Sequence, residues 1–321
     1  MPEVAPGIHR VVFPFAGRVA SVYLLVGARA TLVVDTGVDS TPRAHIEPAL
    51  AELGVAPEQV RWVLATHADL DHHGGHGAMR ELTPDACFAC HEADRAMIED
   101  PARLFSDRYD GFRATHGIAE PESTRAWCLA EGRGTHTDVT LAGGERLQLS
   151  DDWYVEVLGT PGHSRGHLAV RDPRSGAAII ADAALGDGLP GPDGANVAVP
   201  TYRFVDAYLS TIAALEQLRA PLLLTAHFPV LDGEAGADFL ALSRSYALRL
   251  EQAVRDALAS APDGLTTAEV IAAVGPAAGP WPEAARAALV FPVAGHLERL
   301  AAYGEGDVQH ADDPPRWRVR R

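Results

Sequence analysis

The chain has 321 residues, and all 27 of its basic residues are arginine. The missing lysine excludes mechanisms that need a lysine amine, including Schiff-base chemistry, pyridoxal-phosphate attachment and a Walker A phosphate loop. Because 43 carboxylates outnumber the arginines, the formal net charge is −16. A body this acidic repels nucleic-acid phosphates and anionic membranes, so neither is an expected partner.

Strands and helices alternate in the first part of the chain. Apolar runs bounded by glycine-containing turns indicate the strands, and apolar residues at helical spacing indicate the helices. Strands are predicted at 11–15, 21–26, 31–34, 60–65 and 86–89, and helices over 42–53, 77–82 and from residue 92.

The middle of the chain begins with a less regular stretch. Residues 101–137 carry glycine, arginine and aromatic residues, and we interpret them as an insertion or lid. Strands and one helix then resume around a loop at 186–200 that is rich in glycine and proline. The strands are predicted at 145–149, 154–158, 167–171, 177–181 and 222–225, and the helix over 205–218.

From about residue 235 the pattern becomes helical. A long amphipathic helix is predicted over about 237–260, followed by two shorter helical segments. A β-hairpin is predicted over 308–319, with its turn at 312–315. Helix, helix and hairpin in this order indicate a winged-helix-like unit, so we predict a large domain over 1–235 and a small C-terminal domain over 236–321.

Histidine and aspartate follow directly at the ends of predicted strands. Strand ends are where an α/β scaffold presents functional side chains, because rigid elements hold them in place. A short cluster after the strand at 60–65 is especially dense, and two carboxylates in one short loop repel each other unless a cation lies between them. The strand-end residues are His67, His163, Asp182 and His227, and the cluster is His67, Asp69, Asp71 and His72.

Five motifs in this order resemble the metallo-β-lactamase superfamily. They are Asp-Thr-Gly at 35–37, Thr-His-x-Asp-x-Asp-His-x-Gly-Gly at 66–75, Pro-Gly-His at 161–163, Asp182 and His227. The resemblance covers roughly residues 7–232. It implies an αββα sandwich, in which two mixed sheets face each other, helices cover the outside and a dinuclear metal centre lies at one edge.

The resemblance also implies two groups of three ligands, one for each of two divalent ions. The first group is His67, Asp69 and His163, and the second is Asp71, His72 and His227. Asp182 would bridge the two ions. Asp35 would orient the metal-binding loop without binding a metal itself.

Asp69 departs from the family pattern, which usually has histidine at this position. A carboxylate adds a negative charge and hard oxygen ligands, which shifts preference from zinc toward iron or manganese. Di-iron members of the superfamily also carry a carboxylate here, so a di-iron oxidoreductase is one alternative, although their flavin partner domain is absent from this sequence. Another alternative is that Asp69 points away and the first metal is weakly bound or absent.

The resemblance implies a metal-dependent hydrolase with two divalent ions, for which zinc is the expected metal. A cytoplasmic location is expected for a different reason: no apolar run approaches the roughly 18–20 residues needed to cross a bilayer, and the first residues lack the pattern of a signal peptide. Two metal ions lower the pKa of a bridging water, so that hydroxide attacks the substrate at neutral pH and the ions stabilise the oxyanion. Asp71 is the candidate proton acceptor. A small ester, lactone, thioester or related molecule is the expected substrate, and a nuclease or phosphodiesterase is less favoured because the chain is acidic. The ligand set does not identify the substrate.

Residues near the motifs are candidates for substrate contact. His116 and His136 lie in the insertion, Arg165 follows His163 by two residues, and Tyr202 follows the loop at 186–200. Each also has a structural alternative, such as core packing for Tyr202 or a surface ion pair for Arg165.

Two further patterns have structural interpretations. Cys-x-x-Cys-His at 87–91 matches a haem-attachment pattern, but a strand would place its two thiols on opposite faces, so free structural thiols are expected, as for Cys128. The region 262–321 has eight carboxylates and six arginines and no basic recognition face, so we expect it to pack on the catalytic domain or to support a homodimer.

Overall fold

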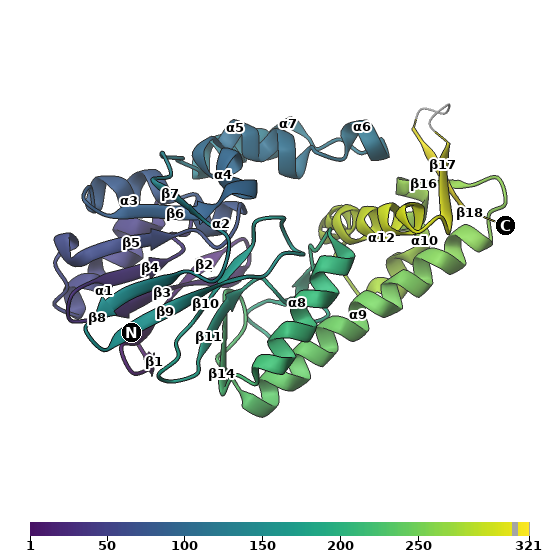
Figure 1. The fold of residues 1–321 in the computed structure, drawn as a ribbon. Coiled ribbons are helices and arrows are strands. Elements are labelled where there is room, and N and C mark those ends of the chain that lie inside the picture. Colours follow the sequence, from purple (N-terminus) through teal and green to yellow (C-terminus); the bar gives the residue numbers. More distant parts are fainter. Residues whose placement is uncertain (310–313, 321) are drawn as a thin grey trace.

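Two β-sheets packed face to face form a sandwich with helices on both outer sides, and the C-terminal part of the chain extends to one side of it (Figure 1). The computed structural model describes residues 1–309 and 314–320. The first sheet has the order β1-β2-β3-β4-β5-β6-β7, and the second has the order β15-β14-β11-β10-β9-β8. Both sheets contain parallel and antiparallel pairs. The architecture confirms the predicted αββα sandwich.

The strands are short and match the predicted apolar runs closely. The first sheet contains β1 (Glu3–Ala5), β2 (Ile8–Phe15), β3 (Arg18–Val26), β4 (Thr31–Val34), β5 (Val60–Leu64), β6 (Cys87–His91) and β7 (Val139–Leu141). The second contains β8 (Arg146–Ser150), β9 (Trp153–Gly159), β10 (Leu168–Arg171), β11 (Ala178–Ala181), β14 (Leu222–Thr225) and β15 (Leu231–Asp232). A separate small ribbon pairs β12 (Leu189–Pro190) with β13 (Asn196–Ala198).

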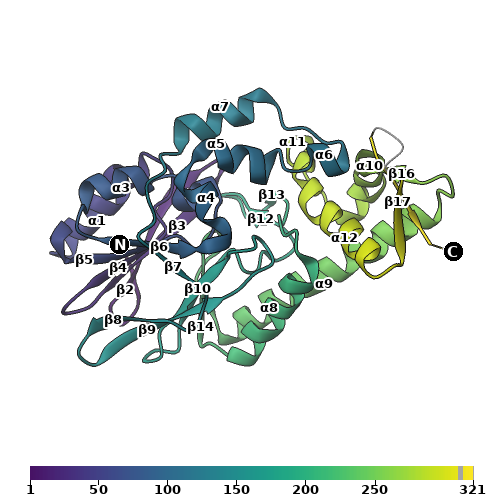
Figure 2. The same cartoon turned by 45° about the horizontal axis from the view of Figure 1, so that its top comes forward.

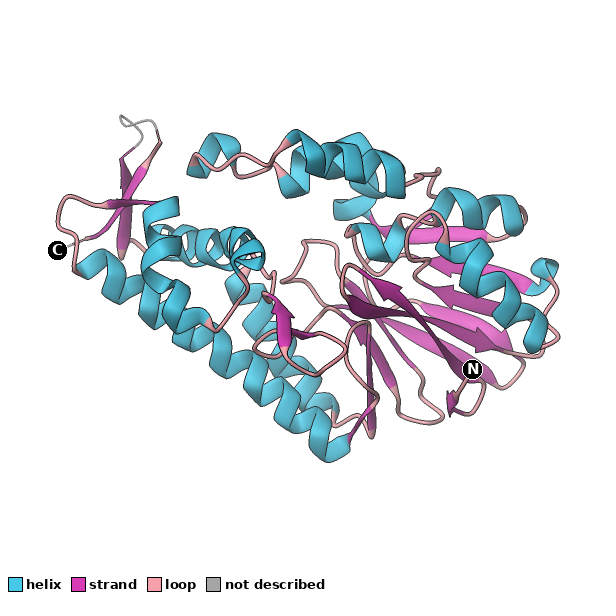
Figure 3. Cartoon of the chain, turned by 180° about the vertical axis from the view of Figure 1, so that it is seen from behind, coloured by secondary structure: helices cyan, strands magenta, loops and turns pink. Residues whose placement is uncertain are grey.

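Helices cover the outer face of each sheet. Those of the first half are η1 (Pro42–Ile46), α1 (Glu47–Glu52), η2 (Pro57–Gln59), α2 (Leu70–His73), α3 (His76–Leu82) and α4 (Glu92–Glu99). The outer face of the second sheet is covered by α8 (Val205–Leu218) and by the first half of α9 (Gly233–Ala259), as Figure 3 shows from behind.

Apolar side chains fill the space between the layers. Leu25, Leu32 and Val157 belong to the cluster between the two sheets, and all three are fully buried. Strands buried on both faces need continuous apolar runs, which is why 22–25 and 31–34 contain so few polar residues. Burying each such side chain stabilises the fold by about 1.5–3 kcal/mol.

The insertion is more regular than its composition indicates. Residues 101–137 fold largely as helices, namely α5 (Pro101–Leu104), η3 (Phe105–Tyr109), α6 (Arg113–His116) and α7 (Glu122–Glu131). The segment extends from the sandwich to the C-terminal part of the chain (Figure 2), where His116 of α6 contacts Thr267 of α10 and Glu298 of α12. The ring of Phe112 packs edge-on against that of Phe291, with 4.9 Å between centroids.

The C-terminal part combines helices with a small sheet. After α9 come β16 (Leu265–Thr266), α10 (Thr267–Ala278), α11 (Glu283–Arg286), η4 (Ala287–Leu289), α12 (Val290–Ala302), β17 (Gly306–Gln309) and β18 (Arg316–Val319). Strands β17 and β18 pair antiparallel, which confirms the predicted hairpin. Residues 310–313, which include part of the turn predicted at 312–315, lie outside the described residues.

One apolar cluster joins the C-terminal part to the sandwich. It runs from Ile180 of β11 through Tyr208 of α8 and Leu250 of α9 to Val293 of α12. The two parts therefore share a core, and the division at residue 235 and the winged-helix-like assignment stay predictions. In the described part of the chain, no helix is long and apolar enough to cross a membrane.

Candidate metal centre

The candidate ligands meet at one edge of the sandwich because of the strand directions. Strands β4 and β5 are parallel, and so are β11 and β14, so their carboxyl ends lie at the same edge of each sheet. The loop after β5 and the short helix α2 present the residues of the 67–72 cluster. His163, Asp182 and His227 follow β9, β11 and β14. The residues that the sequence places after strands therefore lie together at one edge of the sandwich.

Glycines allow the loops at this edge to pack closely. A Cβ atom on Gly75 would lie 2.5 Å from the carbonyl oxygen of Thr36, and one on Gly162 would lie 2.4 Å from the Cα of Tyr208. Any larger residue would push the ligand loops away from β4 and α8. Close packing therefore explains why the motifs at 66–75 and 161–163 have glycine at these two positions.

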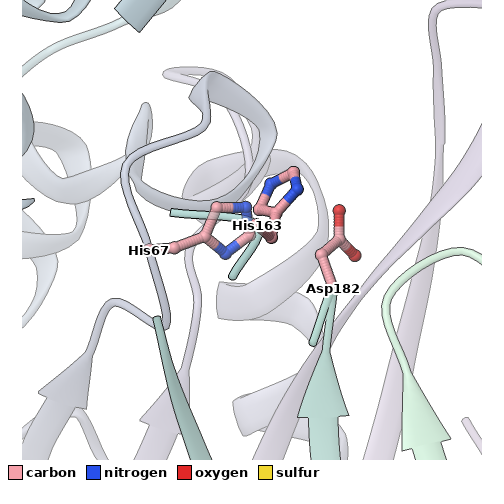
Figure 4. Close-up of side chains that lie close together, drawn as sticks. All are labelled: His67, His163 and Asp182. Atoms are coloured by element: carbon pink, nitrogen blue, oxygen red, sulfur yellow. The ribbon is translucent and has the colours of Figure 1, made fainter. Parts of the chain in front are cut away.

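Two groups of side chains at this edge could each hold a metal ion. His67, His163 and Asp182 form one group (Figure 4), and Asp71, His72 and His227 form the other. Within each group the potential ligand atoms lie within 4.8 Å of one another. All six side chains are buried, and Asp71, at 7% exposed, is the most accessible of them.

Unpartnered buried atoms show that these residues fit a cation. Among the described residues, no hydrogen-bond partner reaches His67 Nε2, His72 Nε2 or Asp182 Oδ1. A buried polar atom without a partner is costly, and divalent ions bind imidazole nitrogen and carboxylate oxygen. His72 Nε2 lies 3.6 Å from Asp182 Oδ2, and His227 Nε2 lies 3.3 Å from the same oxygen. Asp182 therefore lies beside both groups, as expected for a bridging carboxylate.

Asp35 holds the ligand loop in place. Its Oδ1 accepts a hydrogen bond from the backbone N–H of Thr66 at 2.7 Å, and its Oδ2 accepts one from the Thr66 hydroxyl at 2.9 Å. The same Oδ2 lies 2.8 Å from Nδ1 of His72. An N–H at Nδ1 leaves Nε2 of the ring free for a metal. Asp35 also adopts a φ of 65°, an uncommon conformation that aspartate tolerates better than most residues.

Burial and charge perturb the titration of the site residues. Burial alone would lower the pKa of His72, but the carboxylates of Asp35, Asp182 and Asp71 hold it well above its usual range. Burial and the neighbouring imidazoles keep the pKa of His67 well below its usual range. The imidazole among the carboxylates holds a proton that a divalent ion would have to displace, so metal binding there releases protons.

Asp69, which was predicted to bind a metal with His67 and His163, lies beside the group His67, His163 and Asp182, but its carboxylate is held by an arginine. Its Oδ2 lies 2.7 Å from His163 Nε2 and 3.6 Å from His67 Nε2. Arg108 of η3 donates from Nε to Oδ1 at 2.5 Å and from Nη2 to Oδ2 at 2.7 Å. Burial alone would raise the pKa of Asp69, but Arg108 and His163 hold it well below its usual range.

Aromatic and basic side chains from the β2–β3 hairpin and from the insertion lie over the site. The rings of Phe15, in the β2–β3 hairpin, and Trp127 of α7 are 6.1 Å apart, and those of Tyr109 and Trp127 are 6.2 Å apart. Arg18 places Nη2 3.5 Å from Oδ2 of Asp71 and packs on the Phe15 ring. Beside His227 lies a mostly apolar cavity of about 440 Å³, lined also by Val12 and Val19. The site is thus covered above and bordered by apolar space.

Three of the four predicted substrate contacts lie away from the metal groups. His116 is buried between Thr267 and Glu298, with nitrogen–oxygen distances of 3.0 and 3.2 Å, and stacks on Trp317. Tyr202 is fully buried, and its hydroxyl is 2.9 Å from His296 Nε2. These contacts correct the expectation for both residues, because the C-terminal part of the chain occupies the faces that substrate would need.

The other two candidates are exposed. The imidazole of His136 lies 3.4 Å from Glu99 and is 68% exposed, so it does not overhang the site either. Arg165 packs its guanidinium over the Phe204 ring at 4.3 Å and borders a cavity of about 290 Å³ that also reaches Arg108. Of the four, only Arg165 stays a candidate for substrate contact.

Sequence reasoning missed Arg108, Arg18 and Tyr109. The hydroxyl of Tyr109 lies 3.4 Å from Asp69 Oδ1. The only sequence signal for them was chemical: the extra carboxylate at position 69 needs a cation when buried, and the insertion is rich in arginine and aromatic residues. The cysteines are free, as expected, and burial raises the pKa of Cys90 to about 12.

Comparison with known proteins gives a family match over most of the sandwich. A family model described as the metallo-beta-lactamase superfamily matches residues 16–227. A hydroxyacylglutathione hydrolase from Thermosynechococcus vestitus is 29% identical over 145 residues, which are 45% of this chain and 43% of that protein. The uncharacterized protein YobT from Bacillus subtilis is 24% identical over 161 residues, 50% of this chain and 60% of that protein. The matches thus span about half the length of these relatives.

Solved structures share the fold over nearly the whole chain. A metallo-beta-lactamase family protein from Thermus thermophilus has a TM-score of 0.75 at 23% identity, covering 99% of this chain and 100% of that one. A beta-lactamase domain protein from Burkholderia ambifaria has a TM-score of 0.71 at 22% identity, covering 99% and 94%. The shared fold therefore extends through the C-terminal part.

Proposed function

Because this chain belongs to the metallo-beta-lactamase superfamily, we propose that it is a dinuclear metal-dependent hydrolase of small esters, lactones or thioesters. The observation that carries the proposal is the convergence of two His/Asp groups on Asp182, with unpartnered buried atoms on His67 and His72. The similarity to a hydroxyacylglutathione hydrolase supports a thioester among the candidate substrates.

The side chains at the site have separable roles in this proposal. Bound divalent ions would supply an activated water at neutral pH and an electrophile for the substrate carbonyl. Six residues would hold the ions in two groups, and Asp182 would contact both. Asp71, the most accessible of these carboxylates, would accept a proton at Oδ2, beside the Arg18 guanidinium. Asp35 would keep Nε2 of His72 free by accepting a hydrogen bond from Nδ1–H.

The surroundings of the site favour a small, partly apolar substrate. Phe15, Tyr109 and Trp127 would exclude water above Asp69 and Asp71. The apolar cavity beside His227 suits an acyl group better than a phosphate. These features and the net charge of −16 favour hydrolysis of a small molecule over nucleic-acid cleavage.

The ion pair at Asp69 also bears on the metal and on the di-iron oxidoreductase alternative. Asp69 and Arg108 together carry no net charge, like the neutral imidazole usual at this position in the superfamily. The charge argument for iron or manganese is thereby weakened, and zinc is the proposed metal. The cytoplasmic location and a homodimer stay predictions.

The test is an activity panel with controlled metal content. Protein freed of metal with a chelator and reloaded with zinc, iron or manganese is assayed on lactone, thioester, β-lactam and phosphodiester substrates. We expect one of the first two to be hydrolysed by the zinc form, and D182N to lower kcat by about 100-fold or more. The control D172N changes a buried aspartate at the far end of β10. Full activity after chelation, or in D182N, would show that the proposal is wrong.

A further inference from the structure

Arg108, which lies in the insertion, makes several contacts at the group His67, His163 and Asp182. Its Nε and Nη2 donate to the two oxygens of Asp69. Nη2 also lies 3.0 Å from His163 Nε2, and Nη1 donates to the His163 carbonyl oxygen at 3.0 Å. One guanidinium thus engages both oxygens of Asp69 and a ring nitrogen of His163, a member of that group.

The surrounding side chains hold the guanidinium in this position. Arg108 is only 5% exposed at its side chain, and its charge lies 5.1 Å from the centre of the Phe291 ring of α12. Tyr109, the next residue, places its hydroxyl 3.4 Å from Asp69 Oδ1. The C-terminal part of the chain therefore supports an arginine that reaches the candidate metal centre.

The contacts of Asp69 differ from those of Asp182 and Asp71. Asp71 also meets a guanidinium, but through one oxygen, Oδ2, which lies 3.5 Å from Nη2 of Arg18. Asp182 Oδ1 has no described partner, and Asp182 lies beside both groups. Both oxygens of Asp69, in contrast, are taken by a bidentate charge-assisted pair, which is among the stronger hydrogen-bonding arrangements in proteins. A metal ion can use Asp69 only by sharing it with Arg108 or displacing that side chain.

We propose that Arg108 weakens metal binding at the group His67, His163 and Asp182 by competing for Asp69 and His163, so that the group Asp71, His72 and His227 fills first. The proposal rests on the dinuclear centre of the proposed function and adds an order of filling set by a residue outside the ligand motifs. Arg108 is a positioning residue here, since it acts through Asp69 and His163.

Zinc titration of the metal-free full-length protein tests this, with a chromophoric chelator as competitor. We expect two unequal binding steps in the wild type. In R108M the weaker step should tighten by about 10–100-fold, the range in which partners of metal ligands change affinity, while the tighter step stays unchanged. R108K keeps a charge but not the fork of donors, so it should give an intermediate affinity and a second measurement if R108M folds poorly.

Two controls separate this role from a general effect of charge. R103M removes a guanidinium from the same insertion, where Arg103 pairs with Asp107, and should leave both steps unchanged. In a D69N background R108M should have little further effect, because the competed carboxylate is gone. The proposal would be overturned if the weaker zinc-binding step stayed unchanged or became weaker still in both R108M and R108K, or if R103M tightened it as much as R108M does. Neither result would contradict the proposed hydrolase function. Failure of the wild type to bind zinc would overturn both.

Discussion

The hydrogen bonds of Asp35 allow a quantitative prediction for D35N. Asparagine keeps the shape of the side chain and tolerates the φ of 65°, so the substitution adds little backbone strain. The carboxylate accepts three hydrogen bonds, one at Oδ1 from a backbone N–H of Thr66 and two at Oδ2. Because the backbone N–H can only donate, the amide oxygen must face it, and the NH₂ group then faces the Thr66 hydroxyl and Nδ1 of His72.

The conflict falls on His72 rather than on Thr66. A hydroxyl can turn to accept a hydrogen bond, but Nδ1 of His72 can accept only if the proton moves to Nε2, the atom proposed to bind metal. Losing one charge-assisted hydrogen bond costs about 1.5–3 kcal/mol, and tenfold in affinity corresponds to about 1.4 kcal/mol. We therefore expect D35N to weaken zinc binding at the group Asp71, His72 and His227 by at least about tenfold.

Competition titration with zinc measures this effect directly. D172N is the matched control, because Asp172 is equally buried and accepts hydrogen bonds from Trp153 and Ser175 at the far end of β10. It should lower thermal stability without changing zinc affinity. If D35N bound zinc as tightly as the wild type at both steps, the inferred coupling between Asp35 and the His72 tautomer would be refuted.

Three further predictions concern stability. G295A should lower the Tm by several degrees, because a Cβ there would lie 2.1 Å from the Arg203 carbonyl oxygen and would push α12 away. G275A is the control in circular dichroism melts, because a Cβ there meets none of the described atoms within 4 Å. Burial alone would raise the pKa of Glu298, but His116 and Arg203 lower it from 4.5 to about 2; the stabilisation is therefore present above pH 4.5 and is lost as the pH falls from 4.5 toward 2. Urea midpoints of E298Q and wild type should converge over that window, although partial exposure and salt screening reduce the difference, and a constant gap would contradict the assignment. Zinc should raise the Tm of the wild type with increasing concentration and raise that of D182N less, as differential scanning fluorimetry can check.

Local sequence patterns predicted the fold and the positions of the candidate ligands. Strand β4 and helix α8 have the predicted bounds, because a buried strand needs a continuous apolar run and a covering helix needs apolar residues at its own period. His67, Asp182 and His227 were found from their position directly after predicted strands. Parallel strands end at one edge, so strand order and direction were enough to bring distant residues together.

Other features depended on contacts between distant segments. His116 and Tyr202 lie close to motifs or to a site loop in the sequence, but the C-terminal helices cover them. His116 contacts α10 and α12, and Tyr202 contacts α12. The insertion folded largely as helices, although its composition indicated irregular structure, because its short helices pack between the sandwich and the C-terminal part. The composition of the insertion contains no information about the surfaces of the sandwich and of the C-terminal part between which it packs.

The sequence by itself determined that the candidate ligands follow the ends of strands, that lysine chemistry is absent and that position 69 carries an unusual carboxylate. Only the tertiary structure decided how that charge is balanced, because Arg108 reaches Asp69 across 39 positions through the path of the insertion and is supported by Phe291 of α12. A pairing of this kind depends on where two chain segments meet in space. Periodicity and spacing describe each segment alone, so they predict the elements and not their meeting point.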